Sequence, residues 1–199
     1  MTPTHLPGQV AIPSLPAQTR DTPGPRSPLE HFNTAPADDL EPFLLTCLRS
    51  LRWAHRISAH RPYPTLDALL AASDEAAYDL TLGDLSEALA GESLPVLPES
   101  AYSAAHMALD AAHAAYEARF GHTFAICLDG VPPSEFADHL LAAIRSRLAN
   151  DAEEERVVTA EELRRLARGR LVSRLRDAGN SATSHNGTAP GIGRGHPLR

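Results

Sequence analysis

The middle of this chain is patterned for helices. Alanine and leucine together supply 60 of its 199 residues, and β-branched residues are few. Both residue types favour helix, and small side chains let helices pack closely. Apolar residues also recur at the three- and four-residue spacing of one helix face, as in Leu40, Phe43, Leu44, Cys47 and Leu48. The sequence therefore predicts an all-α, compact, single-domain bundle of seven or eight helices, with at most a fragment of extended chain.

Polar residues and breakers mark the expected helix ends. Asp38 and Asp39 suit the positive end of the first helix, and Pro42 fits only within its first turn. We expect the caps of later helices to be Ser50, Thr65, Thr81 and Ser134. The helix after Ser50 carries Trp53 and Ile57 and is broken at Arg61-Pro62, and the helices of the other three caps end near residues 78, 91 and 148. A further helix covers 101–119 and is closed by Gly121. The segment 122–128 is the one candidate for extended chain.

The last expected helix, 152–176, is heavily charged. Glu155 could interact with Thr159 and Arg156 only along one face, and we interpret this surface as solvated.

Proline and glycine concentrate at the two ends of the chain. Eight of the 17 prolines fall within residues 1–36, and five of the 12 glycines fall within 179–199. The ends also carry few large apolar side chains, so burial cannot offset their ordering entropy. The sequence predicts disordered tails over 1–29 and 177–199 and one helical domain over 30–176.

Charge and composition exclude several classes of protein. All 18 basic residues are arginine, and they face 25 acidic residues, giving a net charge of −7. Such a balance is unsuited to a nucleic-acid partner or an anionic membrane surface. No apolar run approaches the roughly 20 residues of a membrane span, and no secretory signal is evident. Two cysteines among apolar neighbours, Cys47 and Cys127, fit a reducing, cytoplasmic location.

An ordered series of short strings gives a more specific indication. The strings are Phe32-Asn33, Cys47-x-x-Ser50-x-x-Trp53, Arg61-Pro62-Tyr63, Asp84-x-x-Glu87-Ala88, Tyr116-Glu117-Ala118-Arg119-Phe120, Ile126-Cys127, Arg147-Leu148-x-Asn150-Asp151, Glu154-Glu155 and Arg170-Leu171. This series resembles the 2-oxo-4-hydroxy-4-carboxy-5-ureidoimidazoline (OHCU) decarboxylases, which act in urate breakdown to allantoin. The resemblance covers roughly residues 31–175.

The resemblance implies an all-helical protein, commonly a homodimer, that works without metal or organic cofactor. Its substrate would be a small ureidoimidazoline, and its product (S)-allantoin. The substrate carries its carboxylate on a carbon next to a ring C=N bond, so the electron pair left by CO2 can flow into that bond. The protein needs only to orient the substrate, exclude water and supply one proton.

The family's two catalytic strings are altered in this chain. The family has a His-Pro-Arg-Ile-Gly string with a catalytic histidine, followed by a Ser-x-x-Glu-Gln string whose glutamate pairs with it. Here Glu92 and Ser93 stand at the His and Pro positions, and His106 stands three residues after Ser103, at the Glu position. We predict an exchanged dyad, with His106 as acid/base and Glu92 orienting it. The alternative is an ordinary helix histidine and a helix-end carboxylate.

Further site residues follow from the same resemblance. Arg170 matches an arginine that binds substrate, and a planar guanidinium suits a carboxylate, a ureido group or a ring carbonyl. The backbone of Phe124, Ala125, Ile126, Cys127 and Leu128 matches a segment that touches substrate. Ser103 and Ser93 are further candidate contacts. Cys127 is an improbable nucleophile, because apolar neighbours raise the pKa of a thiol.

Three alternatives stay open. His106, Asp110 and His113 fall on one helix face and have the spacing of zinc ligands, although chance explains this pattern better in a chain with ten histidines. The second alternative is a non-catalytic relative that binds a ureide or a partner protein. The third is an enzyme that acts on a related β-imino or β-keto acid.

Overall fold

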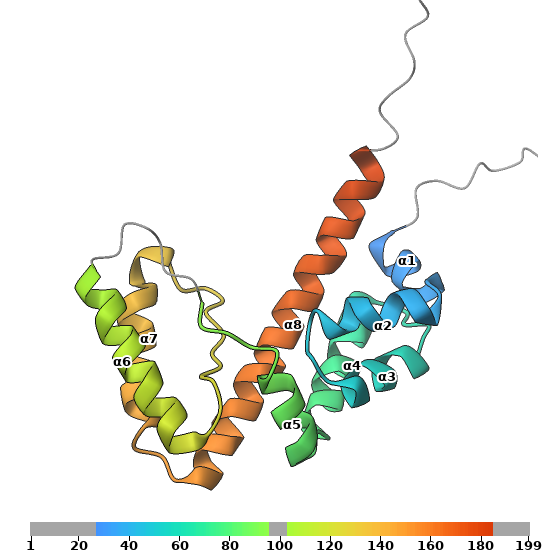
Figure 1. Ribbon diagram of the computed structural model, residues 1–199. Helices are drawn as coiled ribbons and strands as arrows, with labels where there is room; N and C mark the ends of the chain where they lie inside the picture. The colour runs from blue at the N-terminus through green and yellow to red at the C-terminus, as the bar shows by residue number, and fades with distance from the viewer. Residues whose placement is uncertain (1–26, 96–102, 185–199) are drawn as a thin grey trace, which may run out of the picture.

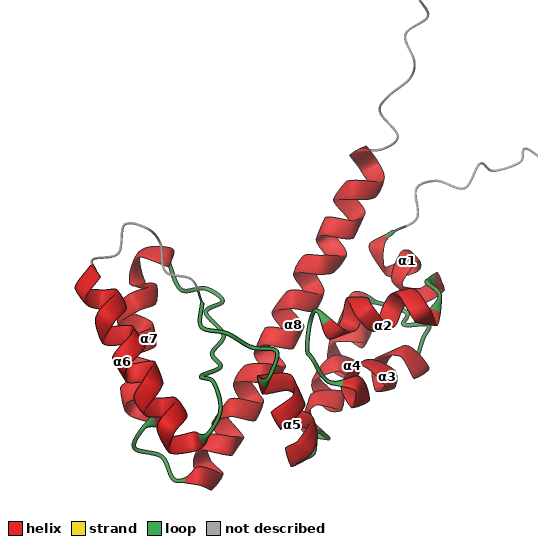
Figure 2. Ribbon diagram, in the orientation of Figure 1, coloured by secondary structure: helices red, strands yellow, loops and turns green. Residues whose placement is uncertain are grey.

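Every regular element that the structure describes is helical. The computed structural model describes residues 27–95 and 103–184, and within them it contains eight α-helices and one 3-10 turn (Figure 2). The elements are α1 (Pro28–Thr34), α2 (Ala37–Leu45), α3 (Leu51–Ala59), α4 (Leu66–Tyr78), α5 (Leu82–Leu89), α6 (Ser103–Phe120), the 3-10 turn Pro133–Glu135, α7 (Phe136–Arg147) and α8 (Ala152–Ser184). The predicted all-α class is confirmed, and the segment 122–128 is irregular chain.

Helix α8 runs between two groups of helices. In Figure 1, α1 to α5 lie on one side of α8, and the α6–α7 pair lies on the other side, near its N-terminal end. The first group packs around a core that includes Leu44, Trp53 and Leu163. The second core contains Tyr116 and Ile144 among its buried residues. No helix in the described ranges is long and apolar enough to cross a membrane.

Capping residues set several helix ends as predicted. The side chain of Ser50 accepts the Trp53 N–H at 3.3 Å, and that of Thr65 accepts the Ala68 N–H at 3.1 Å. Thr81 forms a reciprocal capping box with Asp84.

Helix α6 ends as the sequence predicts. It gives way at Gly121, whose φ of +77° lies in the left-handed region that glycine adopts without steric cost.

Both outer helix boundaries reach beyond the expected domain. Helix α1 begins at Pro28, where Ser27 and Glu30 form a capping box, and α8 continues to Ser184. The helical part therefore starts before residue 30 and ends after residue 176. The rest of each predicted tail lies outside the described residues.

Two proline-related predictions are wrong. Helix α2 begins one turn earlier than expected because the Pro36 carbonyl accepts the N–H groups of Asp39 and Leu40, so Pro42 lies beyond its first turn. Ser134 does not cap α7. It lies within the 3-10 turn, which starts at Pro133 and delays α7 until Phe136.

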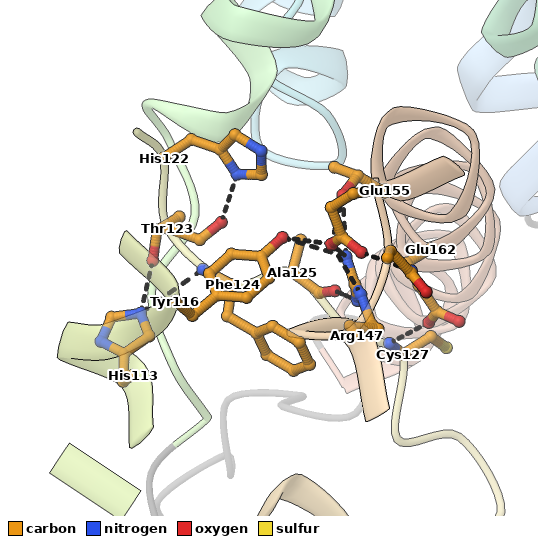
Figure 3. Close-up of polar contacts among 12 residues, drawn as sticks. His113, Tyr116, His122, Thr123, Phe124, Ala125, Cys127, Arg147, Glu155 and Glu162 are labelled. Atoms are coloured by element: carbon orange, nitrogen blue, oxygen red, sulfur yellow. Dashed lines mark hydrogen bonds and ion pairs between the residues drawn. The ribbon is translucent and has the colours of Figure 1, made fainter. Parts of the chain in front are cut away.

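The prediction that the surface of Glu155 is solvated is also wrong. The Glu155 residue is 1% exposed and Thr159 is 2% exposed. The Nε of Arg147, on α7, donates to Glu155 Oε1 at 2.8 Å, and the Tyr116 hydroxyl, on α6, donates to the same oxygen (Figure 3). Asn150 donates to the other carboxylate oxygen at 2.8 Å. Because each carboxylate oxygen has a donor, this glutamate can be buried in its charged form.

Arg147 extends this buried cluster to the irregular segment after α6. It donates to the Ala125 carbonyl at 2.6 Å and to the Thr159 hydroxyl at 2.7 Å. Its guanidinium also lies 4.4 Å from the centre of the Phe124 ring. The cluster therefore joins α6, α7, α8 and the segment that contains Ala125.

We predict that Glu155→Ala strongly destabilises the protein. Removing one partner leaves the Arg147 charge buried without compensation, a change that costs about 3–5 kcal/mol. Urea unfolding followed by circular dichroism measures this loss. Glu153→Ala is the matched control, since Glu153 is an exposed glutamate of the same helix, paired with Arg156. Equal unfolding midpoints for the two variants would contradict the structural role of Glu155.

The same carboxylate predicts a pH dependence of stability. Burial acts to raise the pKa of Glu155, but hydrogen bonds from Arg147 and Tyr116 outweigh it and hold this pKa below the ordinary 4.5. The stabilisation is therefore complete above pH 4.5 and is lost as the pH falls through the folded-state pKa. We expect the free energy of unfolding to fall less steeply between roughly pH 5 and 3 in Glu155→Gln than in the wild type. Glu153→Gln provides the control for the other titrating carboxylates.

Candidate functional site

Glu92 and Arg170, two of the predicted site residues, bind each other. Glu92 follows α5, and Arg170 projects from the middle of α8. The two terminal nitrogens of Arg170 each contact one Glu92 carboxylate oxygen at 2.7 Å. One of these nitrogens also donates to the Cys47 carbonyl at 3.2 Å. The hydrogen bonds with Glu92 raise the pKa of Arg170. The pair is thus a bidentate ion pair that joins α5 to α8.

This pair changes what Arg170 can offer to a ligand. The Glu92 side chain is 5% exposed, whereas the Arg170 side chain is 37% exposed. A guanidinium has five N–H donors, and the Glu92 and Cys47 oxygens take three of them. The two terminal nitrogens of Arg170, which could bind a ligand carboxylate, are occupied by the Glu92 carboxylate. The other two N–H donors of the guanidinium take no part in these contacts.

A cavity of about 530 Å³ adjoins Glu92. Its other walls come from the last turn of α5 and from the C-terminal end of α6 with the residues that follow. The lining includes Ser86, Glu117, Phe120, His122 and Thr123. A volume of this order is typical of small-molecule sites.

The segment predicted to touch substrate is buried, and the protein binds several of its backbone groups. Phe124, Ala125, Ile126 and Cys127 are each at most 8% exposed, while Leu128 is half-buried. The Cys127 N–H donates to Glu162 at 2.6 Å, and the Phe124 N–H donates to His113 Nε2 at 3.4 Å (Figure 3). These contacts fix the segment in place. Its predicted contact with substrate stays a prediction.

His106 lies on a different part of the molecule from Glu92. It occupies the first turn of α6, at the end of the α6–α7 pair away from α8 (Figure 1). At 1.5 Å per residue, the 14 residues from His106 to Phe120, which lines the Glu92 cavity, span about 21 Å of helix. The structure brings Glu92 to Arg170, and the pairing of Glu92 with His106 stays a prediction.

The two predicted serine contacts, Ser93 and Ser103, lie on either side of residues 96–102, which are outside the described ranges. Ser93 is exposed in the loop after α5. Ser103 is the first residue of α6, and its side chain lies outside the described residues, as does the part of the intervening loop that contains Pro98.

The alternative metal site does not assemble. His113 Nε2 accepts the Phe124 N–H and lies 3.1 Å from the Thr123 hydroxyl, so this nitrogen serves the fold. Within the described ranges, no three His, Cys, Asp or Glu side chains gather as metal ligands.

Sequence reasoning missed several residues that shape this region. Glu162 and His122 gave no sign of their places in this region, since each is a common residue type without a flanking pattern, and His113 was noted only as a possible zinc ligand. Arg147 and Glu155 appeared within the strings that carry the family resemblance, but nothing in those strings distinguishes a buried charge from a solvated one.

Comparison with known proteins agrees with the fold. A model of the OHCU decarboxylase family matches residues 33–99 and 93–172. Among solved structures, the crystal structure of (S)-allantoin synthase aligns with a TM-score of 0.58 and 21% sequence identity over 73% of this chain. At this identity the likeness concerns the fold. The alignment covers 53% of the other chain, so this chain spans about half the length of that protein. A search of curated proteins found no match.

We predict that both thiols are unreactive in the folded protein. Burial raises the pKa of Cys47 to about 11 and also raises that of Cys127. Because the thiolate is the reactive form, Ellman's reagent at neutral pH should label the native protein at least about 100-fold more slowly than the urea-unfolded protein. Cys47→Ser and Cys127→Ser assign the remaining signal. Fast labelling of native Cys127 would restore it as a candidate nucleophile.

Proposed function

We propose that this chain, which belongs to the OHCU decarboxylase family, converts 2-oxo-4-hydroxy-4-carboxy-5-ureidoimidazoline to (S)-allantoin without a cofactor, as a step of urate breakdown. The observation that carries the proposal is the extent of the family match. It spans Glu92, the segment 124–128 and Arg170, which are among the residues predicted to form the site. The homodimer that the family resemblance implies belongs to the same proposal.

The substrate accounts for most of the chemistry. The bond between the ring carbon and its carboxylate breaks, CO2 leaves, and the electron pair passes into the neighbouring ring C=N bond. One proton is taken up for each CO2 released. Delivery of this proton to one face of the ring sets the configuration of allantoin. The protein's tasks are therefore orientation, exclusion of water and proton delivery.

The Glu92–Arg170 pair suits a decarboxylase. An arginine that gripped the departing carboxylate would stabilise the ground state and oppose the loss of CO2. Glu92 occupies the guanidinium fork and prevents this grip. The two remaining donors of Arg170 can instead orient the neutral ring or ureido oxygens of the substrate, which carry no charge to be lost.

A second candidate function is binding of a ureide without catalysis. The observation in its favour is that Glu92, at the position of the family's catalytic histidine, is committed to Arg170. A protein that had lost its acid/base group would retain the cavity and the donors of Arg170. The two candidates differ in turnover, which can be measured directly.

We predict that the chain accelerates the formation of optically active allantoin when urate is oxidised and hydrolysed in the same solution. Arg170→Lys removes the planar fork and releases Glu92, and loss of a charged hydrogen bond of about 1.5–3 kcal/mol corresponds to a roughly 10–100-fold fall in kcat/KM. Arg145→Lys, an exposed arginine of α7, is the matched control.

The controls also decide between the two candidates. No acceleration by the wild type, together with binding of (S)-allantoin in calorimetry, would favour the binding protein. Equal activity of the Arg170 and Arg145 variants would remove Arg170 from the site.

A further inference from the structure

We infer that His122 is the imidazole of the Glu92 cavity and delivers the proton that sets the stereocentre of the product. This inference rests on the proposed function and adds a catalytic residue to it. It depends on three observations: the place of His122 in the fold, the orientation of its ring, and the cavity that it shares with Glu92.

The end of α6 places His122 at the cavity. The helix stops at Phe120, and Gly121, with φ at +77°, turns the chain so that His122 begins the segment that leads to Phe124. Glu117, Phe120 and His122 then lie along one wall of the cavity of about 530 Å³, which Glu92 also lines. His122 and Glu92, from distant parts of the chain, thus line the same space.

Hydrogen bonding orients the imidazole ring. Nδ1 of His122 lies 3.0 Å from the Thr123 carbonyl oxygen (Figure 3). A carbonyl oxygen only accepts, so Nδ1 carries the hydrogen of this bond. Nε2 is then the nitrogen left to exchange a proton with a ligand. It accepts a proton in the neutral ring and donates one from the imidazolium form.

The buried cluster holds the ring in this position. The His122 ring packs edge-on against Tyr116, with 5.5 Å between the ring centres and an angle of 76° between the planes. Tyr116 is itself fully buried and donates to Glu155. The Thr123 side chain is held by His113 at 3.1 Å. A half-buried ring with fixed neighbours on two sides is preorganised, as proton transfer in one direction requires.

The proton balance of the reaction is complete with His122 as donor. As the carbon–carboxylate bond breaks, its electron pair enters the ring C=N bond. The imidazolium donates its Nε2 proton to the ring carbon that carries the ureido group, and this carbon becomes the stereocentre. The hydroxyl on the carbon that lost CO2 releases its proton as it becomes the carbonyl. The ring nitrogen that received the electron pair takes up a proton, so the net uptake is one proton.

His122 fits this role better than His106 does. His106 lies in the first turn of the 18-residue helix α6, and His122 lies two residues beyond its last residue, Phe120. At 1.5 Å per residue the helix is about 27 Å long, and the Glu92 cavity adjoins its C-terminal end. A side chain on the first turn does not span this length. His122 needs no rearrangement to reach the cavity.

The test compares three histidine variants of the full-length chain in the coupled allantoin assay. We expect His122→Gln to lower kcat by about 10²–10⁴, the usual contribution of a positioned acid or base. His55→Gln, at an exposed histidine of α3, is the matched control and should keep the wild-type rate. His122→Phe, which retains an aromatic ring beside Tyr116, should show the same loss if the loss comes from chemistry and not from packing.

His106→Gln separates this inference from the dyad predicted from the sequence. Wild-type activity in His122→Gln together with a large loss in His106→Gln would overturn the inference and leave the proposed function intact. If the wild type itself shows no acceleration, the proposed function fails.

A titration that does not depend on turnover gives a second readout. Histidine-ring 15N NMR with added (S)-allantoin, with His122 assigned through its variants, reports whether the ligand reaches Nε2. A shift of the His122 signals supports its place in the ligand site. Binding that leaves these signals unmoved overturns it.

Discussion

The buried ion pair between Arg147 and Glu155 fixes the geometry on which the site depends. Charges at this depth persist only when hydrogen bonds replace the water they lose. Arg147 meets this condition by binding Glu155, Thr159 and the Ala125 carbonyl. The Ala125 contact matters most for function, because the segment after α6 has no helical hydrogen bonds of its own. Together with the hydrogen bond from the Cys127 N–H to Glu162 on α8, the Arg147 contact holds that segment in place.

A second ion pair, between Glu92 and Arg170, lies at the other end of the site and differs from the first in its exposure to solvent. Glu92 is nearly buried, while Arg170 is partly open to solvent, so this pair can rearrange at lower cost than the Arg147 pair. The cavity lies between the C-terminal end of α6 with the chain after it and the end of α5, where Glu92 binds Arg170. This arrangement lets one side orient a proton donor while the other adjusts to the ring and ureido oxygens of a ligand.

The sequence predicted local structure well and tertiary environment poorly. Ser50, Thr65 and Thr81 cap their helices as expected, because capping depends on a few neighbouring residues. The burial of Glu155 was not predictable in the same way. It lies in a run of three glutamates, and only the docking of α6 and α7 onto α8 decides which of them leaves solvent. The dyad of Glu92 with His106 rests on string positions and stays a prediction, and about 21 Å of helix separates His106 from the end of α6 beside Glu92.

That separation suggests how a family's chemistry can persist when its signature strings are altered. Acid–base catalysis requires an imidazole within reach of the reacting carbon and a fixed orientation for its ring, and it sets no requirement on the order of these groups along the chain. In this chain the position of the family's histidine carries a carboxylate that neutralises Arg170, and an imidazole enters the same cavity from the turn after α6. Under the proposed function, the cavity would keep an imidazole and a carboxylate, with a different segment supplying the imidazole.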